Sequence, residues 1–252
     1  MGTVAPNRVA SGMKILILGD TAEARDLAGL LVAQGHDVTS SLAGRTQAPI
    51  LPEGAVRVGG FGGASGLAAY LHSAGIERLV DATHPYAGTM SRNAVAAARD
   101  SGVALVRLMR PEWTQPEGAD WITVETAAEA AAALPADAAV LLTTGHTGLT
   151  QFLERRDCRF VVRLIEAPEI VIPSHAALLQ RRPPYGLDDE MDLLERERIT
   201  HLVTKNSGGG QTAAKLEAAR RLGVRVIMIA RPAYGPATEV SSVEAAIVAL
   251  AV

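Results

Sequence analysis

The sequence predicts an α/β fold with two mainly parallel sheets, each flanked by helices. Three observations predict it. Short apolar runs recur along the chain, and a turn and an amphipathic stretch follow each run. The first run, KILILG at 14–19, is apolar without alternation, as expected for a strand buried on both faces. Aromatic residues make up only 4% of the chain, which favours small parallel-sheet units over a β-sandwich.

The first half of the chain is typical of a doubly wound sheet. After the strand at 14–19, Leu27, Leu30 and Leu31 follow helical spacing, and Gly35 supplies a C-terminal stop. The same alternation then continues. Further strands are predicted at 36–42, 55–61, 77–88 (running into a loop) and 103–111, with helices at 22–35, 64–75 and 91–102.

A domain boundary is predicted in EWTQPEGADW at 112–121, where Pro, Gly and two Trp residues interrupt the pattern. We therefore expect a first domain at 13–113 and a second at 114–252. Residues 1–12 are interpreted as a flexible leader or a remnant of an expression tag. In the second domain, strands are predicted at 121–125, 138–145, 159–168, 200–205 and 224–232, and helices at 126–136, 146–156, 187–198, 212–223 and 242–252.

Composition narrows the class of protein. A net charge of −3 argues against a general nucleic-acid binder, and no apolar run reaches the ~18 residues that a membrane span needs. Cys158 is the only cysteine, so no intramolecular disulfide can form, which fits a reducing cytoplasm. The six His residues show no i, i+4 pairing, so no metal site is predicted. We expect a cytoplasmic protein that does not associate with a membrane.

Ligands of open parallel sheets bind at the carboxyl ends of the strands, so the residues that follow each strand are the candidate ligand contacts. Gly19, Asp20 and Thr21 follow the first strand and precede a helix start. Their backbone N–H groups and the positive helix end suit a pyrophosphate. The full G-x-G-x-x-G fingerprint is absent, and a plain strand-to-helix connection is the alternative.

The stretch TSSLAGRT at 39–46 indicates the choice of nucleotide. Many NAD enzymes place an acid here for the ribose hydroxyls, whereas this chain has Ser40, Ser41 and Arg45. Hydroxyl and guanidinium groups can donate to a 2′-phosphate, which a carboxylate would repel. The stretch therefore favours NADP over NAD. The alternative is a solvated Arg in an ordinary loop.

The loop ATHPYAG at 82–88 carries groups that can act on protons. Thr83, His84 and Tyr86 lie at a strand end, and both His and Tyr can serve as general acids. The loop could hold a nicotinamide or position a proton donor. The alternative is a structural loop before a helix that Ser91 caps.

The second half collects cations, hydroxyls and glycines at its strand ends. LLTTG places Thr144 and Gly145 after a strand, and VTKNSGGG places a Lys and two polar residues before a glycine run. The Lys precedes the glycines, so the G-x-x-x-x-G-K-[ST] motif of a P-loop is absent, and a nucleoside triphosphatase is rejected. We predict an anion cradle; a hinge is the alternative. The predicted substrate-binding residues are Arg110, Thr144, Gly145, Lys205, Asn206, Ser207, Gly208, Gly209 and Arg231.

Several stretches together resemble one family. LGDTAEARDLA, SSLAGRT, VDATHPYA, LLTTG and VTKNSGGGQTAAKLEAARRLGVRVIMIARP resemble the precorrin-6A reductase family of corrin biosynthesis, with the resemblance covering residues 13–250. The resemblance implies two Rossmann-like domains with an interdomain cleft. It also implies NADPH-dependent reduction of a double bond of precorrin-6A, giving precorrin-6B on the route to cobalamin.

Under this resemblance the strand-end residues take definite roles. Ser40, Ser41 and Arg45 would hold the 2′-phosphate, the turn at 19–21 the pyrophosphate, and Thr83 the nicotinamide region. The proton would come from His84, Tyr86, Lys205 or water. The partner is expected to be a small-molecule tetrapyrrole bound by a monomer.

Three alternatives stay open from the sequence. The substrate could carry cobalt, as in a cobalt-precorrin-6A reductase. The chain could instead be an NADPH reductase of a smaller carbonyl or imine. It could also be a non-catalytic two-domain binder of an anionic metabolite.

Overall fold

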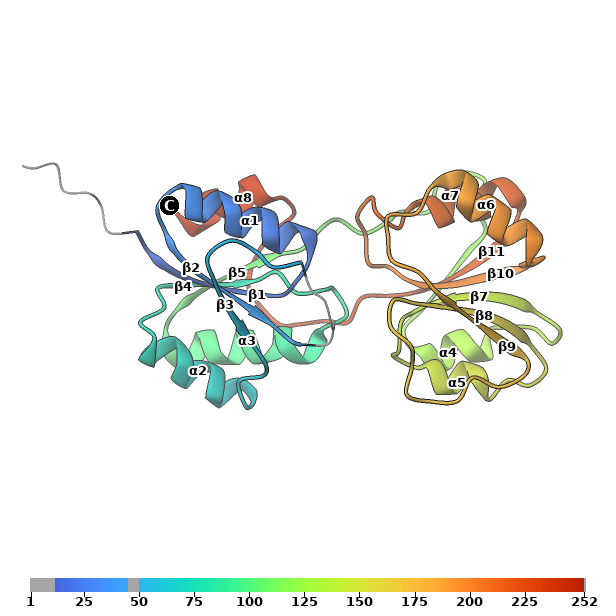
Figure 1. Cartoon of the computed structure of the whole chain (residues 1–252), viewed down its shortest axis with the longest axis horizontal. Coiled ribbons are helices and arrows are strands. Elements are labelled where there is room, and N and C mark those ends of the chain that lie inside the picture. The colour runs from blue at the N-terminus through green and yellow to red at the C-terminus, as the bar shows by residue number, and fades with distance from the viewer. Residues whose placement is uncertain (1–11, 45–49, 252) are drawn as a thin grey trace, which may run out of the picture. The chain divides into compact units, whose positions relative to one another are not determined.

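The computed structural model describes residues 12–44 and 50–251 and divides the chain into two compact units (Figure 1). The first unit contains the described residues up to Arg110 together with those from Ala233 onward. The second unit is Pro111–Pro232. Each unit is a parallel sheet with helices on both faces, so the predicted two-domain α/β fold is confirmed.

The sheet of the first unit has six parallel strands in the order β12-β5-β4-β1-β2-β3. This is the arrangement of a doubly wound dinucleotide-binding sheet, in which the strand order reverses between β1 and β4. The crevice outside those two strand ends is where such sheets bind ligands. The strands are β1 (Lys14–Leu18), β2 (Asp37–Leu42), β3 (Ala55–Val58), β4 (Arg78–Asp81), β5 (Ala104–Leu108) and β12 (Thr238–Val240).

Four helices cover this sheet: α1 (Ala22–Ala33) and α8 (Val243–Leu250) on one face, α2 (Gly63–Ser73) and α3 (Gly88–Ser101) on the other (Figure 1). Alternate residues of β1 serve the two faces, as strand geometry requires. Ile15 and Ile17 pack in the core with α1 and α8, whereas Leu16 and Leu18 pack in the core with α2 and α3. Both faces of β1 are therefore apolar.

The sheet of the second unit also has six parallel strands, in the order β6-β11-β10-β7-β8-β9. Helices α6 and α7 cover one face, and α4 and α5 cover the other (Figure 1). Here the strand order reverses between β7 and β10. The elements are β6 (Trp121–Val124), α4 (Ala127–Ala132), β7 (Ala139–Thr143), α5 (Leu149–Leu153), β8 (Arg159–Leu164), β9 (Ala176–Gln180), α6 (Leu187–Arg196), β10 (His201–Lys205), α7 (Ala214–Leu222) and β11 (Arg225–Ile229).

The predicted second domain, 114–252, is wrong at its end. The chain returns to the first unit, where β12 pairs with β5 in the register Val106↔Thr238 and α8 packs against α1. The Nε of Arg78 in β4 also donates to the carbonyl of Leu250 at 3.1 Å. Periodicity identifies a helix at the C-terminal end of the chain but not the sheet that it covers, because that choice depends on tertiary packing.

Four further elements differ from the prediction. Strand β9 lies in 174–186, where no strand was predicted, and β12 has only three residues. Helix α5 begins at Leu149 rather than at residue 146, because Gly148 takes a left-handed conformation at φ +75°. Helix α3 begins at Gly88, so Ser91 lies inside it and is not its cap.

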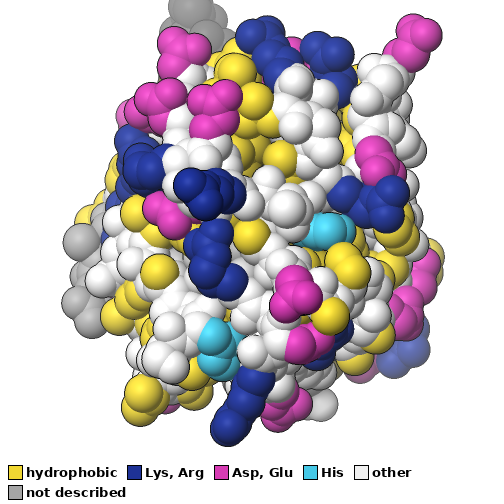
Figure 2. All heavy atoms as spheres, turned by 90° about the vertical axis from the view of Figure 1, so that its right-hand side faces the viewer, with side chains coloured by type: hydrophobic (Ala, Val, Ile, Leu, Met, Phe, Trp, Pro, Cys, Tyr) yellow, Lys and Arg dark blue, Asp and Glu magenta, His cyan; other side chains and the backbone are white. Residues whose placement is uncertain are grey.

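Charged side chains of both signs mix on the face shown in Figure 2. Exposed ion pairs of the second unit include Arg155–Asp157 at 2.8 Å and Arg225–Asp120 at 2.6 Å. A face on which the two signs alternate offers a polyanion no extended attractive field. Within residues 12–44 and 50–251, no helix is long and apolar enough to cross a membrane.

Candidate functional site

The turn after β1 lies where the first sheet reverses its strand order, and it requires glycine. Gly19 has φ +118°, and a Cβ on it would lie 2.5 Å from the carbonyl oxygen of Ala82. The N–H of Gly19 donates to the carbonyl of Ser41 at 3.0 Å, and the N–H of Ala82 donates to that of Leu18 at 2.9 Å. The ends of β1, β2 and β4 are thus held close together.

Thr21 begins helix α1 and ties it to the end of β4. Its Oγ1 accepts a hydrogen bond from the N–H of Ala24 at 3.1 Å and donates to the carbonyl of Ala82 at 2.9 Å. The Asp20 side chain is exposed, and the carbonyl of Asp20 accepts from Nη1 of Arg25 at 2.7 Å. Backbone N–H groups at the start of α1 are therefore the donors that this turn offers a phosphate.

The predicted pair of hydroxyls at the end of β2 is split between the two faces of the sheet. Ser40 and Ser41 are successive residues of a strand, so their side chains point in opposite directions. Ser40 is 1% exposed, and its Oγ has no hydrogen-bond partner among the described residues. Oγ of Ser41 accepts from Nη1 of Arg57 at 2.8 Å. Arg45, the predicted guanidinium, lies outside the described residues.

Arg57, in the neighbouring strand β3, was not among the predicted site residues. It pairs in register with Ser41, and its guanidinium lies 3.7 Å from the ring centroid of Phe61 and 5.3 Å from that of Tyr70. Nη1 also donates to the carbonyl of Gly59 at 3.0 Å. An Arg within an otherwise apolar strand was the signal in the sequence. The structure thus places a fixed guanidinium at the strand end where the 2′-phosphate was predicted.

The loop after β4 joins Thr83, His84 and Tyr86, as predicted. Oγ1 of Thr83 donates to Oδ1 of Asp81 at 2.7 Å and lies 3.3 Å from Oγ of Ser91. The N–H of Tyr86 donates to Nδ1 of His84 at 3.2 Å, and the two ring centroids are 5.9 Å apart. Because Nδ1 accepts this bond, the proton of a neutral His84 ring is on Nε2.

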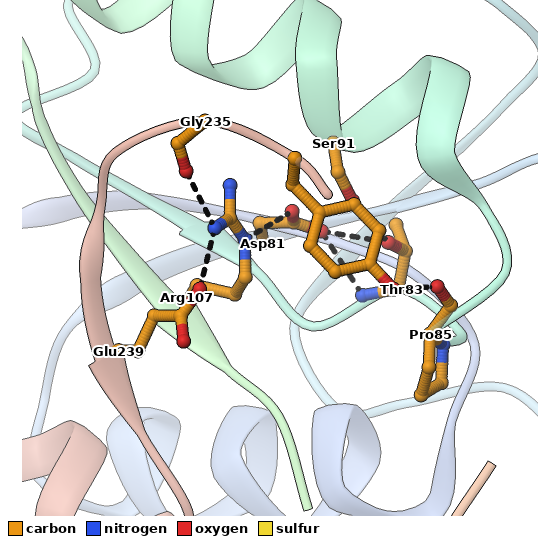
Figure 3. A network of polar contacts seen from close by, with 8 residues as sticks. Asp81, Thr83, Pro85, Ser91, Arg107, Gly235 and Glu239 are labelled. Carbon is orange, nitrogen blue, oxygen red and sulfur yellow. Dashed lines mark hydrogen bonds and ion pairs between the residues drawn. The ribbon is translucent and has the colours of Figure 1, made fainter. Parts of the chain in front are cut away.

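A polar network around the buried Arg107 supports this loop (Figure 3). Arg107 of β5 is 0% exposed; its Nε donates to Oδ2 of Asp81 at 3.3 Å, and its Nη1 donates to Oε1 of Glu239 at 2.7 Å. The hydroxyl of Tyr234 donates to the carbonyl of Pro85. The predicted site residues did not include Asp81, Arg107, Tyr234 or Glu239. Asp81 and Arg107 pair across β4 and β5, and Tyr234 and Glu239 reach them only because the chain returns to the first sheet.

A second candidate site lies where the other sheet reverses its order, between β7 and β10. Thr144 follows β7 and is 0% exposed, and its Oγ1 has no hydrogen-bond partner in the described part of the chain. Gly145 has φ +70°, and a Cβ there would lie 3.8 Å from Nζ of Lys205. The structure thus brings the predicted Thr144, Gly145 and Lys205 together.

Asn206 and Arg231 hold the segment 111–113 against the end of β10. Oδ1 of Asn206 accepts from the N–H of Trp113 at 2.8 Å, and its Nδ2 donates to the carbonyl of Trp113 at 3.0 Å. Nε of Arg231 donates to the carbonyl of Asn206 at 2.7 Å, and Nη2 donates to the carbonyl of Pro111 at 3.3 Å. Both predicted residues are thus engaged in fixing the start of the second unit.

The glycine run after β10 packs closely on the same segment. Gly208 has φ +67°, and a Cβ there would lie 2.1 Å from the carbonyl oxygen of Pro111. The carbonyl of Gly209 accepts from Nε1 of Trp113 at 3.0 Å, and the N–H of Ser207 donates to the carbonyl of Lys205 at 2.7 Å. The run therefore serves close backbone packing beside Lys205, a need the sequence pattern did not reveal.

Arg110 belongs to the first unit rather than to the second candidate site. Its Nη1 donates to Oε1 and Oε2 of Glu23, in the first turn of α1, at 3.3 and 3.2 Å. The predicted substrate-binding residues are therefore divided between the units.

No cluster of three or more metal-ligating side chains occurs in the residues that the structure describes. Cys158 is 4% exposed, and burial raises the pKa of its thiol. A buried, protonated thiol is a poor nucleophile and a poor metal ligand. Cys158 is thus a packing residue.

The fold and the two strand-end sites define an α/β protein with two doubly wound sheets of the Rossmann type. The chain belongs to the family described as precorrin-6x reductase CbiJ/CobK, whose model matches residues 14–251. The family resemblance expected from the sequence is therefore confirmed.

Named relatives extend over nearly the whole chain. The precorrin-6A reductase of Rhodococcus erythropolis is 48% identical over 228 residues, which is 90% of this chain and 92% of that protein. The cobalt-precorrin-6A reductase of Priestia megaterium is 30% identical over 251 residues, covering 94% of this chain and 97% of that protein. A solved structure of CobK precorrin-6A reductase matches with a TM-score of 0.89 at 42% identity, covering 95% of this chain and 96% of that one.

Proposed function

We propose that this chain reduces one double bond of precorrin-6A with NADPH, giving precorrin-6B in cobalamin biosynthesis. The observation that carries the proposal is the 48% identity to a precorrin-6A reductase over 90% of the chain. Identity to a cobalt-precorrin-6A reductase is lower, at 30%. This difference favours the metal-free substrate.

The residues at the end of β1 and β2 fit a reduced nicotinamide dinucleotide. A Cβ at Gly19 would meet the carbonyl of Ala82, so the turn beside the helix start has room only for glycine. The buried Oγ of Ser40 has no partner among the described residues. When bound, the cofactor supplies the hydride, and the protein supplies orientation and exclusion of water.

Arg57 and Ser41, together with Arg45, favour NADPH over NADH. Carboxylates that hold the ribose hydroxyls of NAD would repel a 2′-phosphate, whereas a guanidinium can bind it with charge-assisted hydrogen bonds. The ring of Phe61, 3.7 Å below the Arg57 guanidinium, limits its rotamers. A guanidinium fixed in this way loses little side-chain entropy on binding an anion.

His84, Tyr86 and Lys205 are the candidate proton donors. The neutral His84 ring carries its proton on Nε2, the nitrogen that is not bound to the loop backbone. Tyr86 lies beside it, with ring centroids 5.9 Å apart. A proton donor must come close enough to the substrate carbon to protonate it, either directly or through one water. Water is the alternative donor.

Thr144, Gly145 and Lys205 are proposed to hold a carboxylate of the tetrapyrrole. Lys205 supplies the positive charge beside Gly145, and the buried Oγ1 of Thr144, which has no partner among the described residues, is available as a hydroxyl. Asn206, Ser207, Gly208, Gly209 and Arg231 act here by shaping the backbone around Lys205. Arg110, in the first unit, is also proposed as a substrate contact.

Anaerobic incubation with precorrin-6A and either NADPH or NADH tests the proposal. The expected result is oxidation of NADPH, followed at its absorbance band, with formation of precorrin-6B; cobalt-precorrin-6A serves as the comparison substrate. Binding of the tetrapyrrole without NADPH binding or turnover would instead identify a non-catalytic binder.

Replacing Lys205 with Ala tests the second site. Removing one charge-assisted contact costs about 1.5–3 kcal/mol, so KM for precorrin-6A is expected to rise about tenfold or more. The matched control is Lys14→Ala. Lys14 is exposed at the start of β1, in the first unit, and its replacement is expected to leave KM unchanged. Equal kinetics in the two variants would remove Lys205 from substrate binding.

A further inference from the structure

We propose that Tyr234 is a positioning residue of the cofactor site, holding the loop 83–87 so that His84 and Tyr86 keep the orientation that reduction requires. The inference rests on the proposed function of that loop. It assigns a role at the first site to the segment 233–240, which follows the second unit in the chain.

The contact falls on the one loop residue that cannot donate a backbone hydrogen bond. Pro85 has no N–H, so its carbonyl is its only polar backbone group. The hydroxyl of Tyr234 donates to that carbonyl. On either side of Pro85, His84 and Tyr86 carry the candidate proton-donating side chains. Tyr234 thus fixes the peptide between these two groups.

Two further hydrogen bonds of the loop are local and join its own residues. The N–H of Ala87 donates to the carbonyl of His84 at 2.7 Å, and the N–H of Tyr86 donates to the His84 ring at 3.2 Å. Both bonds remain if the loop moves as a body. The bond from Tyr234 instead joins the loop to a residue 149 positions further along the chain.

Tyr234 is itself held firmly, which a positioning role needs. It is 8% exposed, and its ring centroid lies 5.1 Å from Cζ of the buried Arg107. On its C-terminal side, the carbonyl of Gly235 accepts from Nη1 of Arg107 at 3.0 Å, and Glu239 accepts from the same nitrogen at 2.7 Å.

The Asp81–Arg107 pair links the two ends of this support. Asp81 accepts from Thr83 at 2.7 Å on one side and from Arg107 at 3.3 Å on the other. The start of the loop and the segment that carries Tyr234 are therefore tied to one buried ion pair. The Tyr234 hydroxyl adds the contact at the centre of the loop.

Tyr234→Phe tests the inference, because it keeps the ring over Arg107 and removes only the hydroxyl. Tyr185→Phe is the matched control: its hydroxyl also donates to a backbone carbonyl, that of Arg181 at 2.9 Å, in the second unit. Both variants are compared with the unchanged chain by hydrogen–deuterium exchange and by steady-state kinetics.

The expected result is faster exchange in the peptide that spans residues 83–90 of Tyr234→Phe, with exchange in β1 and β5 unchanged. We also expect kcat to fall about tenfold or more, since small misplacements of reacting groups are costly, while KM for NADPH stays within about twofold. Tyr185→Phe is expected to change neither quantity.

Unchanged exchange in 83–90, or equal kcat in the Tyr234→Phe and Tyr185→Phe variants, would overturn the inference. If exchange rises throughout the first unit, Glu239→Gln decides: it loosens the same segment without touching the ring and must raise exchange in 83–90 selectively. If the unchanged chain fails to reduce precorrin-6A with NADPH, the proposed function fails, and the exchange measurement still decides whether Tyr234 positions the loop.

Discussion

Arg107 carries a charge into the interior of the first unit, and its partner there is Asp81. The two side chains are 0% and 1% exposed, so solvent screens neither charge. A buried ion pair adds little stability over an apolar pair, but removing one member leaves an uncompensated buried charge. The pair is therefore expected to be intolerant of single substitutions.

Asp81→Asn is predicted to lower the free energy of unfolding by about 3 kcal/mol, because Arg107 then keeps only the Glu239 carboxylate. Urea denaturation measures the change. Asp157→Asn is the control, since the Arg155–Asp157 pair is substantially exposed and is expected to contribute little to the free energy of unfolding. Equal losses in the two variants would show that the Asp81–Arg107 pair is screened after all.

His201, at the start of β10, gives stability a dependence on pH. Burial, and next the charge of Arg225, lower the pKa of its imidazole below the ordinary 6.5, although Asp120 opposes this. As pH falls through 6.5, the unfolded chain takes up a proton that the folded chain does not, so the folded state loses stability.

We predict that the His201→Gln variant loses less thermal stability between about pH 8 and pH 5 than the unchanged chain does. Differential scanning calorimetry across that range measures the slope. His146→Gln, at an exposed position, is the matched control. A slope that His201→Gln leaves as steep as before would remove His201 as the cause.

At the scale of elements, the connection from β1 to α1 depends on Gly19 for space as well as for conformation. Gly35, at the other end of α1, also has a positive φ, +88°, but a Cβ there would meet nothing within 4 Å. The two positions separate conformational strain from a steric clash.

Gly35→Ala is predicted to cost about 1 kcal/mol of stability, the strain of a left-handed alanine, and to leave NADPH binding intact. Gly19→Ala adds the clash with Ala82 and moves the crevice, so it is predicted to cost more stability and to weaken NADPH binding at least tenfold. Calorimetric titration and urea denaturation check both variants. NADPH binding by Gly19→Ala as tight as that of the unchanged chain would place the cofactor elsewhere.

The helices and strands also show how much of the fold and of the candidate sites the sequence predicts. Apolar runs and glycine stops predicted nearly all strands and helices. The rule of strand ends led to the turn at Gly19, the loop at His84 and the approach of Gly145 to Lys205. Arg57 and the Arg107 network were missed because their partners lie in other strands. Asn206 looked like a ligand residue, whereas its amide binds Trp113. Side-chain pairing across a fold follows from packing, which periodicity does not contain.

For the whole molecule, the division into units predicts unequal effects of shortening the chain. Removing residues 238–252 takes β12 and α8 from the first unit and exposes Ile15, Ile17 and Val106 in its core. We predict that the first unit then loses its cooperative fold, whereas the second unit, which is one continuous stretch of the chain, keeps its own.

Limited proteolysis followed by mass spectrometry measures this outcome, and the fragment 111–232 alone is the control for the second unit. Cleavage is expected throughout residues 13–110 of the shortened chain, with 121–229 protected. Equal protection of both units would mean that β12 and α8 are dispensable.

Because β12 and α8 follow the second unit in the chain, the first unit is completed after the second during synthesis. A ribosome releases the second unit complete while the first still lacks an edge strand and a helix that covers Ile17 and Val80. The sheet of the first unit therefore stays incomplete, with part of its core exposed, until β12 and α8 have been synthesised. Chaperones that bind nascent chains are expected to dwell on the beginning of this protein for longer than on its middle.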